Sequence, residues 1–231
     1  MRKILALLLL IPFLQLHAQD DGFVGSFDMQ IHTYKKDKEE KDSPVTVRFW
    51  SKEDQLVMQP LMKGPDAQDV RMITDMKKDE MYTLITDASG KKMAMKMPRP
   101  KVDPAQAGEG EDDMEITKTN ETKTIEGHTV RKYVGRDEDG SWTAWVAEDL
   151  KAPFEQFSRA LGGGATGKKQ PKGPATLADG MPLETTWEAH DGREKMVMYM
   201  KNLKVGSVDE KAFDMSGYEV MELPGMMGGG R

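Results

Sequence analysis

The stretch MEITKTNETKTIEGHTVRKYVGRDEDGSWTAWVAEDL, residues 114–150, is the part of the chain that decides the expected fold. It holds three strand-like segments separated by two turn signals, Glu126-Gly127 and Asp137–Gly140. Glycine and aspartate at such positions are typical of tight hairpin turns. The sequence therefore predicts an antiparallel meander here, followed by a helix that starts at Asp149, a favourable N-cap residue.

Alternating apolar and polar residues predict further strands on both sides of this meander. Phe23, Phe27, Met29 and Ile31 fall on one face of the first strand, at 22–34. The others are expected at 45–50 and 56–59, in a second meander within 69–98, at 181–190, at 193–205 and near 217–223, with a short turn or helix at 209–213. This pattern predicts a mainly β protein, built as a curved antiparallel sheet or half-open β-barrel.

One substantial helix is predicted at 149–161, because Leu150, Phe154, Phe157 and Leu161 recur at helical spacing. Three glycines end it, and they allow it to swing as a lid over the concave face of the sheet. Two polar stretches rich in glycine, proline and charge, at 99–113 and 162–179, are predicted to be mobile loops. A single domain is expected over 19–225, followed by a disordered tail at 226–231.

The N-terminus has the three parts of a secretory signal peptide. Arg2 and Lys3 precede the apolar run 4–11, and Ala18 ends a cleavage motif, so residues 1–18 are predicted to be removed. No segment reaches the roughly 20 apolar residues of a transmembrane helix. The chain has no cysteine for lipid attachment. A periplasmic or secreted protein without a lipid anchor is therefore expected.

The charge of the chain argues against nucleic acid as a partner. The net charge is −6, and loss of Arg2 and Lys3 with the leader makes it −8. Phosphate backbones are bound by basic surfaces, which this composition does not favour.

Catalytic motifs are weak throughout, so we expect a protein that is not an enzyme and has neither catalytic residues nor a cofactor. The run 162–168 reads G-x-x-x-x-G-K, but Lys169 replaces the Ser or Thr of a phosphate-binding loop. His32, His128 and His190 have no metal-ligand spacing, which leaves only a zinc site assembled across strands as an alternative.

Methionine is the main anomaly of the composition, with 19 residues. Two triplets, Met93/Met95/Met97 and Met196/Met198/Met200, alternate along predicted strands. Three interpretations stay open. The triplets are ordinary core residues, or an adaptable lining for a hydrophobic ligand, or soft thioether ligands for Cu(I).

Residues 117–133, together with 145–150, 180–184 and 213–218, resemble the secreted bacterial family called domain of unknown function 4412. Family members typically carry a cysteine shortly after the hairpin turn, where this chain has Gly127-His128-Thr129-Val130. The family is similar in layout to the periplasmic lipoprotein carriers LolA and LolB. The resemblance thus implies a half-open antiparallel barrel, with helices over an apolar cavity.

These observations together predict an exported cell-envelope protein that binds a hydrophobic or amphipathic ligand, a lipid or acyl chain, on a methionine-lined concave surface. The alternatives are a Cu(I)-binding protein and a non-enzymatic envelope scaffold, with other envelope proteins as further partners. No metal ligand is assigned. The predicted ligand-binding residues are Phe154, Phe157, Leu161, Met93, Met95, Met97, Met196, Met198, Met200 and Trp187.

Overall fold

The computed structural model describes residues 23–62, 64, 69–87, 89–99, 115–136, 139–150 and 180–222. Within these ranges the chain forms thirteen strands, joined in one sheet, and a short 3-10 helix, η2 (Glu210–Phe213). The strands are β1 (Gly25–Lys35), β2 (Lys38–Glu39), β3 (Val45–Lys52), β4 (Gln55–Pro60), β5 (Asp69–Asp75), β6 (Glu80–Thr86), β7 (Lys92–Pro98), β8 (Glu115–Ile125), β9 (His128–Arg136), β10 (Gly140–Ala147), β11 (Met181–Ala189), β12 (Glu194–Val205) and β13 (Glu219–Glu222). The predicted mainly β architecture is confirmed.

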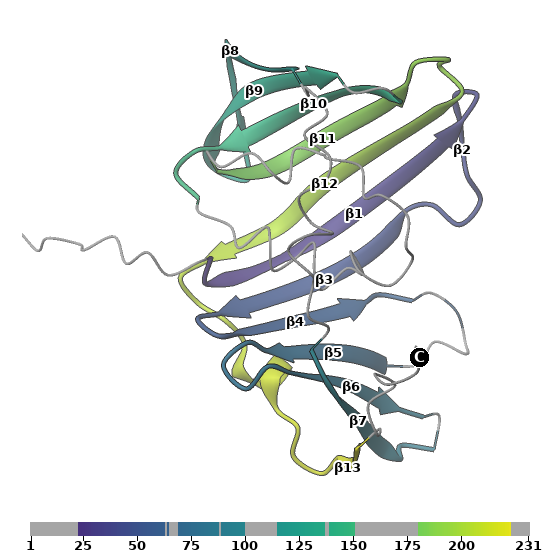
Figure 1. The fold of residues 1–231 in the computed structure, drawn as a ribbon, viewed down its shortest axis with the longest axis vertical. Helices are drawn as coiled ribbons and strands as arrows, with labels where there is room; N and C mark the ends of the chain where they lie inside the picture. Colours follow the sequence, from purple (N-terminus) through teal and green to yellow (C-terminus); the bar gives the residue numbers. More distant parts are fainter. Residues whose placement is uncertain are drawn as a thin grey trace, which may run out of the picture.

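The order of the strands shows how the two meanders are joined. Across the sheet it is β13-β7-β6-β5-β4-β3-β1-β12-β11-β10-β9-β8, and β2 pairs with β1 alone. The first strand, β1, therefore lies between β3 and β12 and links the β3–β7 meander to the β8–β12 meander. The sheet is strongly curved, with β8 and β13 at its opposite ends (Figure 1). This is the curved, open arrangement that the sequence predicts.

The last strand departs from the predicted antiparallel pattern. β13 runs parallel to β7, with Glu219 opposite Met93 and Glu222 opposite Lys96. The chain reaches β13 through a long connection that contains η2, and such a connection can deliver a strand in either direction, unlike a tight hairpin. Asp209 is the N-cap of η2 and accepts a hydrogen bond from the Lys211 backbone N–H. The short helix predicted at 209–213 is thereby confirmed.

The hairpin turn at the centre of the 114–150 stretch has the predicted geometry. Glu126 and Gly127 both have positive φ, 49° and 85°, as a two-residue type I′ turn requires. Strands β8, β9 and β10 follow one another as an antiparallel meander around this turn.

The predicted lid helix gains no support from the described residues. Asp149 lies in a turn after β10, and Leu150 is buried in the hydrophobic core. Residues 151–161, with Phe154, Phe157 and Leu161, lie outside the described residues. The same holds for the predicted signal peptide 1–18, for residues 100–113 and 162–179 of the predicted loops, and for the predicted tail 226–231.

The largest hydrophobic cluster connects the two meanders. It contains Phe27 and Met29 of β1, Phe49 of β3, Val130 of β9 and Met200 of β12, all at most 4% exposed. The rings of Phe27 and Phe49 stack with their centroids 5.1 Å apart. The apolar side of the central strands is therefore a true core, as their alternation predicts.

Candidate functional site

The pairing register determines which side chains share a face of the sheet. Residues directly opposite each other on neighbouring strands point to the same side, and side chains alternate along each strand. From β12 through β1 and β3 to β7, this rule places one group of methionines on a single side, which we call the methionine face. Its members are Met29, Met58, Met72, Met81, Met93, Met95, Met97, Met196, Met198 and Met200.

Both methionine triplets lie on this face, but they lie far apart. The strands β1, β3, β4, β5 and β6 separate β12 from β7. At about 4.8 Å per strand, the two triplets are roughly 29 Å apart along the sheet. The two triplets therefore belong to different parts of the methionine face.

Burial divides the methionine face into two parts. In the central part, Met29, Met58 and Met200 are buried. In the β5–β7 flank, the methionines are only half-buried; they are Met72, Met81, Met93, Met95 and Met97. Side chains that stay partly accessible on an apolar face can contact a ligand, whereas the central ones serve packing.

The other end of the methionine face combines methionine with tryptophan. Met196 is 38% exposed and lies directly opposite Trp187 of β11, which in turn lies opposite Trp142 of β10. Trp187 packs against a separate buried cluster that includes Tyr133, Trp142 and Ala144. The structure therefore brings together two of the predicted ligand-binding residues, Met196 and Trp187.

A register shift within β11 separates Trp187 from the first residues of that strand. Simple alternation places Met181, Leu183 and Trp187 on the same face of β11, but the register between β10 and β11 shifts by one residue near Leu183. As a result Met181 lies opposite Ala147, while Trp187 lies opposite Trp142. Those two partners are five residues apart on an undistorted strand, so they point to opposite sides.

A partly buried ion pair lies on the opposite face of the central strands. Asp28 of β1 accepts hydrogen bonds from Arg48 Nε and Nη2, at 2.6 and 2.9 Å, and from Asn202 Nδ2 at 2.8 Å. Its side chain is 7% exposed, against 41% for that of Arg48. Asn202 has a positive φ of 55° where the β1–β12 register shifts, so its contact with Asp28 stabilises this irregularity.

The bonds from Arg48 hold the pKa of the Asp28 carboxyl below its ordinary value, although burial acts in the other direction. Alternation along β1 predicts that Asp28 faces solvent, and only the pairing of β1 with β3 reveals its partner. The sequence alone offered no signal for this pair.

The opposite face of the β5–β7 flank is covered by the chain that leads to β13. Phe213, Met215 and Tyr218 pack against a buried cluster that includes Ile73 and Leu84. Arg71 of β5 donates through Nη1 to the carbonyl oxygens of Lys211 and Ala212, and through Nη2 to the Tyr218 hydroxyl, at 3.0, 3.0 and 3.1 Å. This arginine therefore fixes the covering segment to the sheet.

The described residues offer no site for a hard metal ion. Nowhere in the described part of the chain do three or more His, Cys, Asp or Glu side chains group around a common point. His32 pairs with Glu39 and His128 with Asp149, each at 2.8 Å. These two histidines thus take part in separate local contacts at different places in the sheet.

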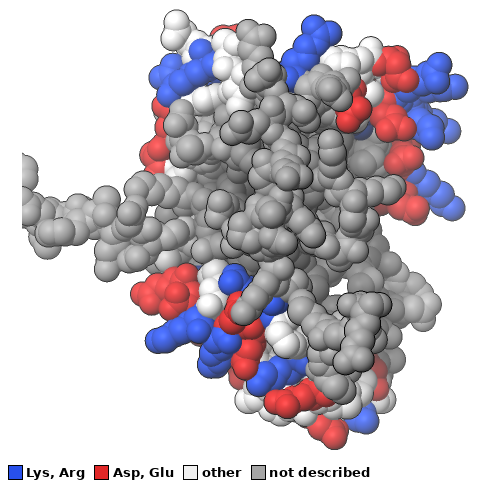
Figure 2. Space-filling view, viewed as in Figure 1, with Lys and Arg blue, Asp and Glu red and all other residues white. Residues whose placement is uncertain are grey.

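Charges on the molecular surface are mixed in sign. In the described part of the view in Figure 2, Lys and Arg side chains are interspersed with Asp and Glu. No helix among the described residues has the length and apolar character needed to cross a membrane.

A comparison with known protein families identifies the family of this chain. A family profile described as domain of unknown function DUF4412 matches residues 23–218, from just before β1 to just before β13. The chain belongs to the DUF4412 family. No curated protein sequence matches it.

Several solved structures resemble this DUF4412 chain, at low similarity. PNGF-II has a TM-score of 0.41 and 16% identity, with 87% of this chain and 31% of PNGF-II covered, so the chain spans about a third of that protein. The Mycobacterium tuberculosis lipoprotein LppX has a TM-score of 0.36 and 10% identity, with coverage of 80% and 89%. A putative outer membrane lipoprotein-sorting protein domain from Vibrio parahaemolyticus has a TM-score of 0.34 and 10% identity, with coverage of 84% and 91%. Likeness at this level says nothing about what the DUF4412 chain binds.

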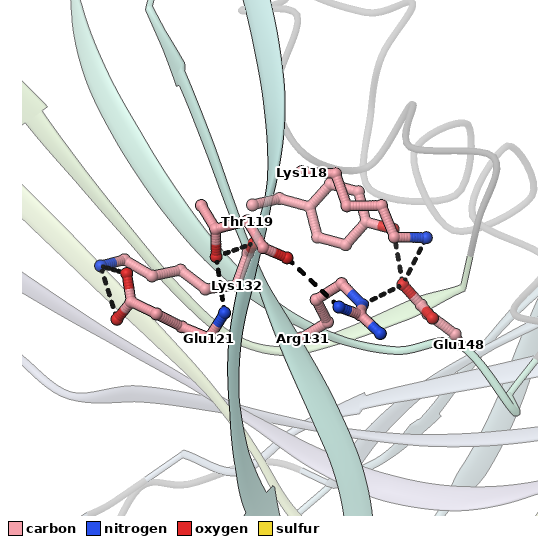
Figure 3. Close-up of polar contacts among 7 residues, drawn as sticks. Lys118, Thr119, Glu121, Arg131, Lys132 and Glu148 are labelled. Atoms are coloured by element: carbon pink, nitrogen blue, oxygen red, sulfur yellow. Dashed lines mark hydrogen bonds and ion pairs between the residues drawn. The ribbon is translucent and has the colours of Figure 1, made fainter.

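The segments that carry the DUF4412 resemblance have structural roles. Residues 117–133 form the β8–β9 hairpin, and Glu148 ties it to the end of β10 (Figure 3). The Glu148 carboxylate accepts from Tyr133 Oη at 2.8 Å and pairs with Lys118 at 2.8 Å and Arg131 at 3.1 Å. These donors, Lys118 first, hold the pKa of Glu148 below its ordinary value.

A second group in the same hairpin fixes the irregular middle of β8. Lys132 pairs with Glu121 at 2.9 Å, and the Thr119 hydroxyl donates to the Lys132 carbonyl oxygen at 3.0 Å (Figure 3). The β8–β9 register shifts between Lys118 and Thr122, so these bonds hold the bulged residues in place. The hairpin residues thus support the fold, and the methionine face remains the candidate functional site.

Proposed function

We propose that the protein is exported to the cell envelope and binds a hydrophobic or amphipathic ligand, a lipid or acyl chain, on the methionine face. The activity is binding without catalysis. The observation that carries this proposal is the half-buried β5–β7 flank, where Met93, Met95 and Met97 lie on the same face as Met72 and Met81.

The chemistry of methionine supports this assignment. Its side chain is unbranched and flexible, so a surface of methionines adapts to apolar partners of different shape. Met196, Met198 and Trp187 extend the surface at the β12 end of the methionine face. Phe154, Phe157 and Leu161 stay predicted contacts of the same ligand. The leader at residues 1–18 supports the envelope location.

The test places a charge in the middle of the proposed ligand surface. Thr83 of β6 is half-buried and lies between Met72 and Met95 on the methionine face. Thr83→Lys should weaken binding of a fluorescent fatty acid to the mature chain by about tenfold, because an ammonium group next to an acyl chain is costly to desolvate. Thr46→Lys is the matched control, since Thr46 is half-buried on the opposite face of β3.

Native mass spectrometry of the protein from its own envelope provides an independent readout. A retained lipid would add its mass to the wild-type protein and be lost from Thr83→Lys. If the wild type neither retains a lipid nor binds the fatty acid, the binding proposal is wrong and the scaffold interpretation replaces it.

A further inference from the structure

Four methionines gather around β7 at one end of the methionine face. Met81 of β6 lies directly opposite Met97 of β7. Met95, two residues before Met97, lies opposite Met221 of β13. We call these four residues the thioether cluster. Met221 is 45% exposed, and the other three are half-buried.

The register brings these four side chains within reach of a common point. Directly opposite residues have Cβ atoms about 5 Å apart, and residues two apart on one strand are separated by about 7 Å. Met81, Met97, Met95 and Met221 therefore form a continuous chain of neighbours on one face. Each has three rotatable side-chain bonds, so their sulfur atoms can turn toward one centre.

The donor type identifies the class of ligand. Thioether sulfur is a soft donor that suits Cu(I), whereas hard ions such as Mg²⁺ and Ca²⁺ prefer oxygen. We propose that the thioether cluster binds one soft monovalent ion, Cu(I) or its redox-inert analogue Ag(I), through Met81, Met95 and Met97, with Met221 at the rim. This binding needs neither the lipid nor the fatty acid of the proposed function.

The structure assigns the ion to one triplet and not to the other. Met196 lies opposite Thr33 and Trp187, and Met198 lies opposite Ile31 and Thr185. Met200 lies opposite Met29, but both of these side chains are buried. The β12 triplet thus lacks an accessible methionine on a neighbouring strand, which the β7 triplet has in Met81.

Competition with a chromogenic Cu(I) chelator under reducing conditions tests the assignment on the mature chain. Met81→Leu/Met95→Leu/Met97→Leu should lower the Cu(I) affinity by at least about tenfold. Met196→Leu/Met198→Leu/Met200→Leu is the matched control and should stay within about twofold of the wild type. Leucine keeps the volume and apolar character of methionine, so both variants should stay folded. Cu(I) competition and fatty-acid binding are measured separately on the wild type, so failure of this proposal and failure of the proposed function give different results.

Methyl NMR of the wild-type chain gives a readout that does not depend on how the variants fold. With ¹³C-methyl methionine, Ag(I) should shift the signals of Met81, Met95 and Met97 and saturate at one ion per chain. The proposal is overturned if the wild type does not compete with the chelator, if both triple variants lose affinity equally, or if the Ag(I) shifts fall on the β12 triplet.

Discussion

The central part of the methionine face and its β5–β7 flank share a residue type but differ in burial. In the centre, Met200 lies opposite Met29 and contacts the core that contains Phe27 and Phe49. In the flank, Met95 lies between Thr83 and the exposed Met221. Methionine on the same face therefore serves packing at Met200 and forms part of an accessible surface at Met95.

The comparison of Met200 with Met95 shows that the surrounding strands decide whether a methionine is buried. β12 lies in the middle of the sheet, between β1 and β11, whereas β7 lies next to the short end strand β13. A strand near the end of an open sheet has fewer neighbours to cover its side chains. The accessibility of Met95 is consistent with this position, since Met200 has the same residue type and is buried.

The largest expected effect tests this difference in burial directly. Met200→Ala should lower the free energy of unfolding by about 2–5 kcal/mol, the range for a buried large-to-small change. Met95→Ala should cost about 1 kcal/mol, because its half-buried side chain leaves a smaller cavity. Urea unfolding of both variants measures the contrast. Equal losses would show that the two parts of the face are packed alike.

Much of the sheet could be predicted from the sequence. Alternation located β1, β3, β4 and β12 to within a few residues, because each has one apolar side that must be buried. The Glu126-Gly127 turn was equally predictable, since few residue pairs suit a type I′ turn. The direction of β13 was not, because nothing local to a four-residue strand specifies parallel or antiparallel pairing.

The candidate site was predictable only in part. The two triplets stand out in the sequence, but their cross-strand partners Met72 and Met81 come from other strands and are visible only through the register. The bulge near Leu183 also could not be predicted, and it moved Met181 to the side opposite Trp187. A one-residue shift reverses every side chain beyond it, so pattern alone cannot assign faces there.

The next-largest expected loss of stability concerns the ion pair between Asp28 and Arg48, on the face of the central strands opposite the methionine face. Arg48→Ala removes the main partner of Asp28, whose side chain is nearly buried. Breaking a fully buried ion pair costs about 3–5 kcal/mol; since Arg48 is partly exposed and screened by solvent, we expect about 1–3 kcal/mol. Urea unfolding at neutral pH measures this loss. Arg48→Lys is the control, because it keeps the charge but loses the two parallel hydrogen bonds.

The pH dependence of this loss has a definite sign. The pKa of Asp28 is lowered in the folded protein, chiefly because Arg48 donates to it. The stability gained from the ionised carboxylate is therefore fully present above the ordinary value of 3.8 and is lost as the pH falls through the lowered folded pKa. The difference between wild type and Arg48→Ala should shrink in that acid range. A difference that stays constant would mean that Arg48 acts through packing alone.

The smallest effect concerns the reverse side of the flank, where the Tyr218 hydroxyl meets Arg71 Nη2 at 3.1 Å and Thr86 Oγ1 at 3.0 Å. Tyr218→Phe removes that hydroxyl but keeps the ring that packs on Ile73 and its neighbours. The expected loss is about 1 kcal/mol, the low end for two hydrogen bonds of about 0.5–1.5 kcal/mol each, because Tyr218 is only half-buried. Because these bonds hold the covering segment to the sheet, amide exchange should rise in residues 212–222 and stay unchanged in β1 and β12.

Thr86→Val completes a double-mutant cycle with Tyr218→Phe. Thr86 and Arg71 both contact the same hydroxyl, so losing Thr86 after Tyr218 should cost less than losing it from the wild type. A positive coupling of this kind, together with exchange confined to the flank, would show that the flank opens independently of the central core. Additive losses would mean that the contact between Thr86 and the Tyr218 hydroxyl does not stabilise the flank. Faster exchange in β1 and β12 as well would mean that the flank and the centre open as one unit and that their difference is limited to side-chain burial.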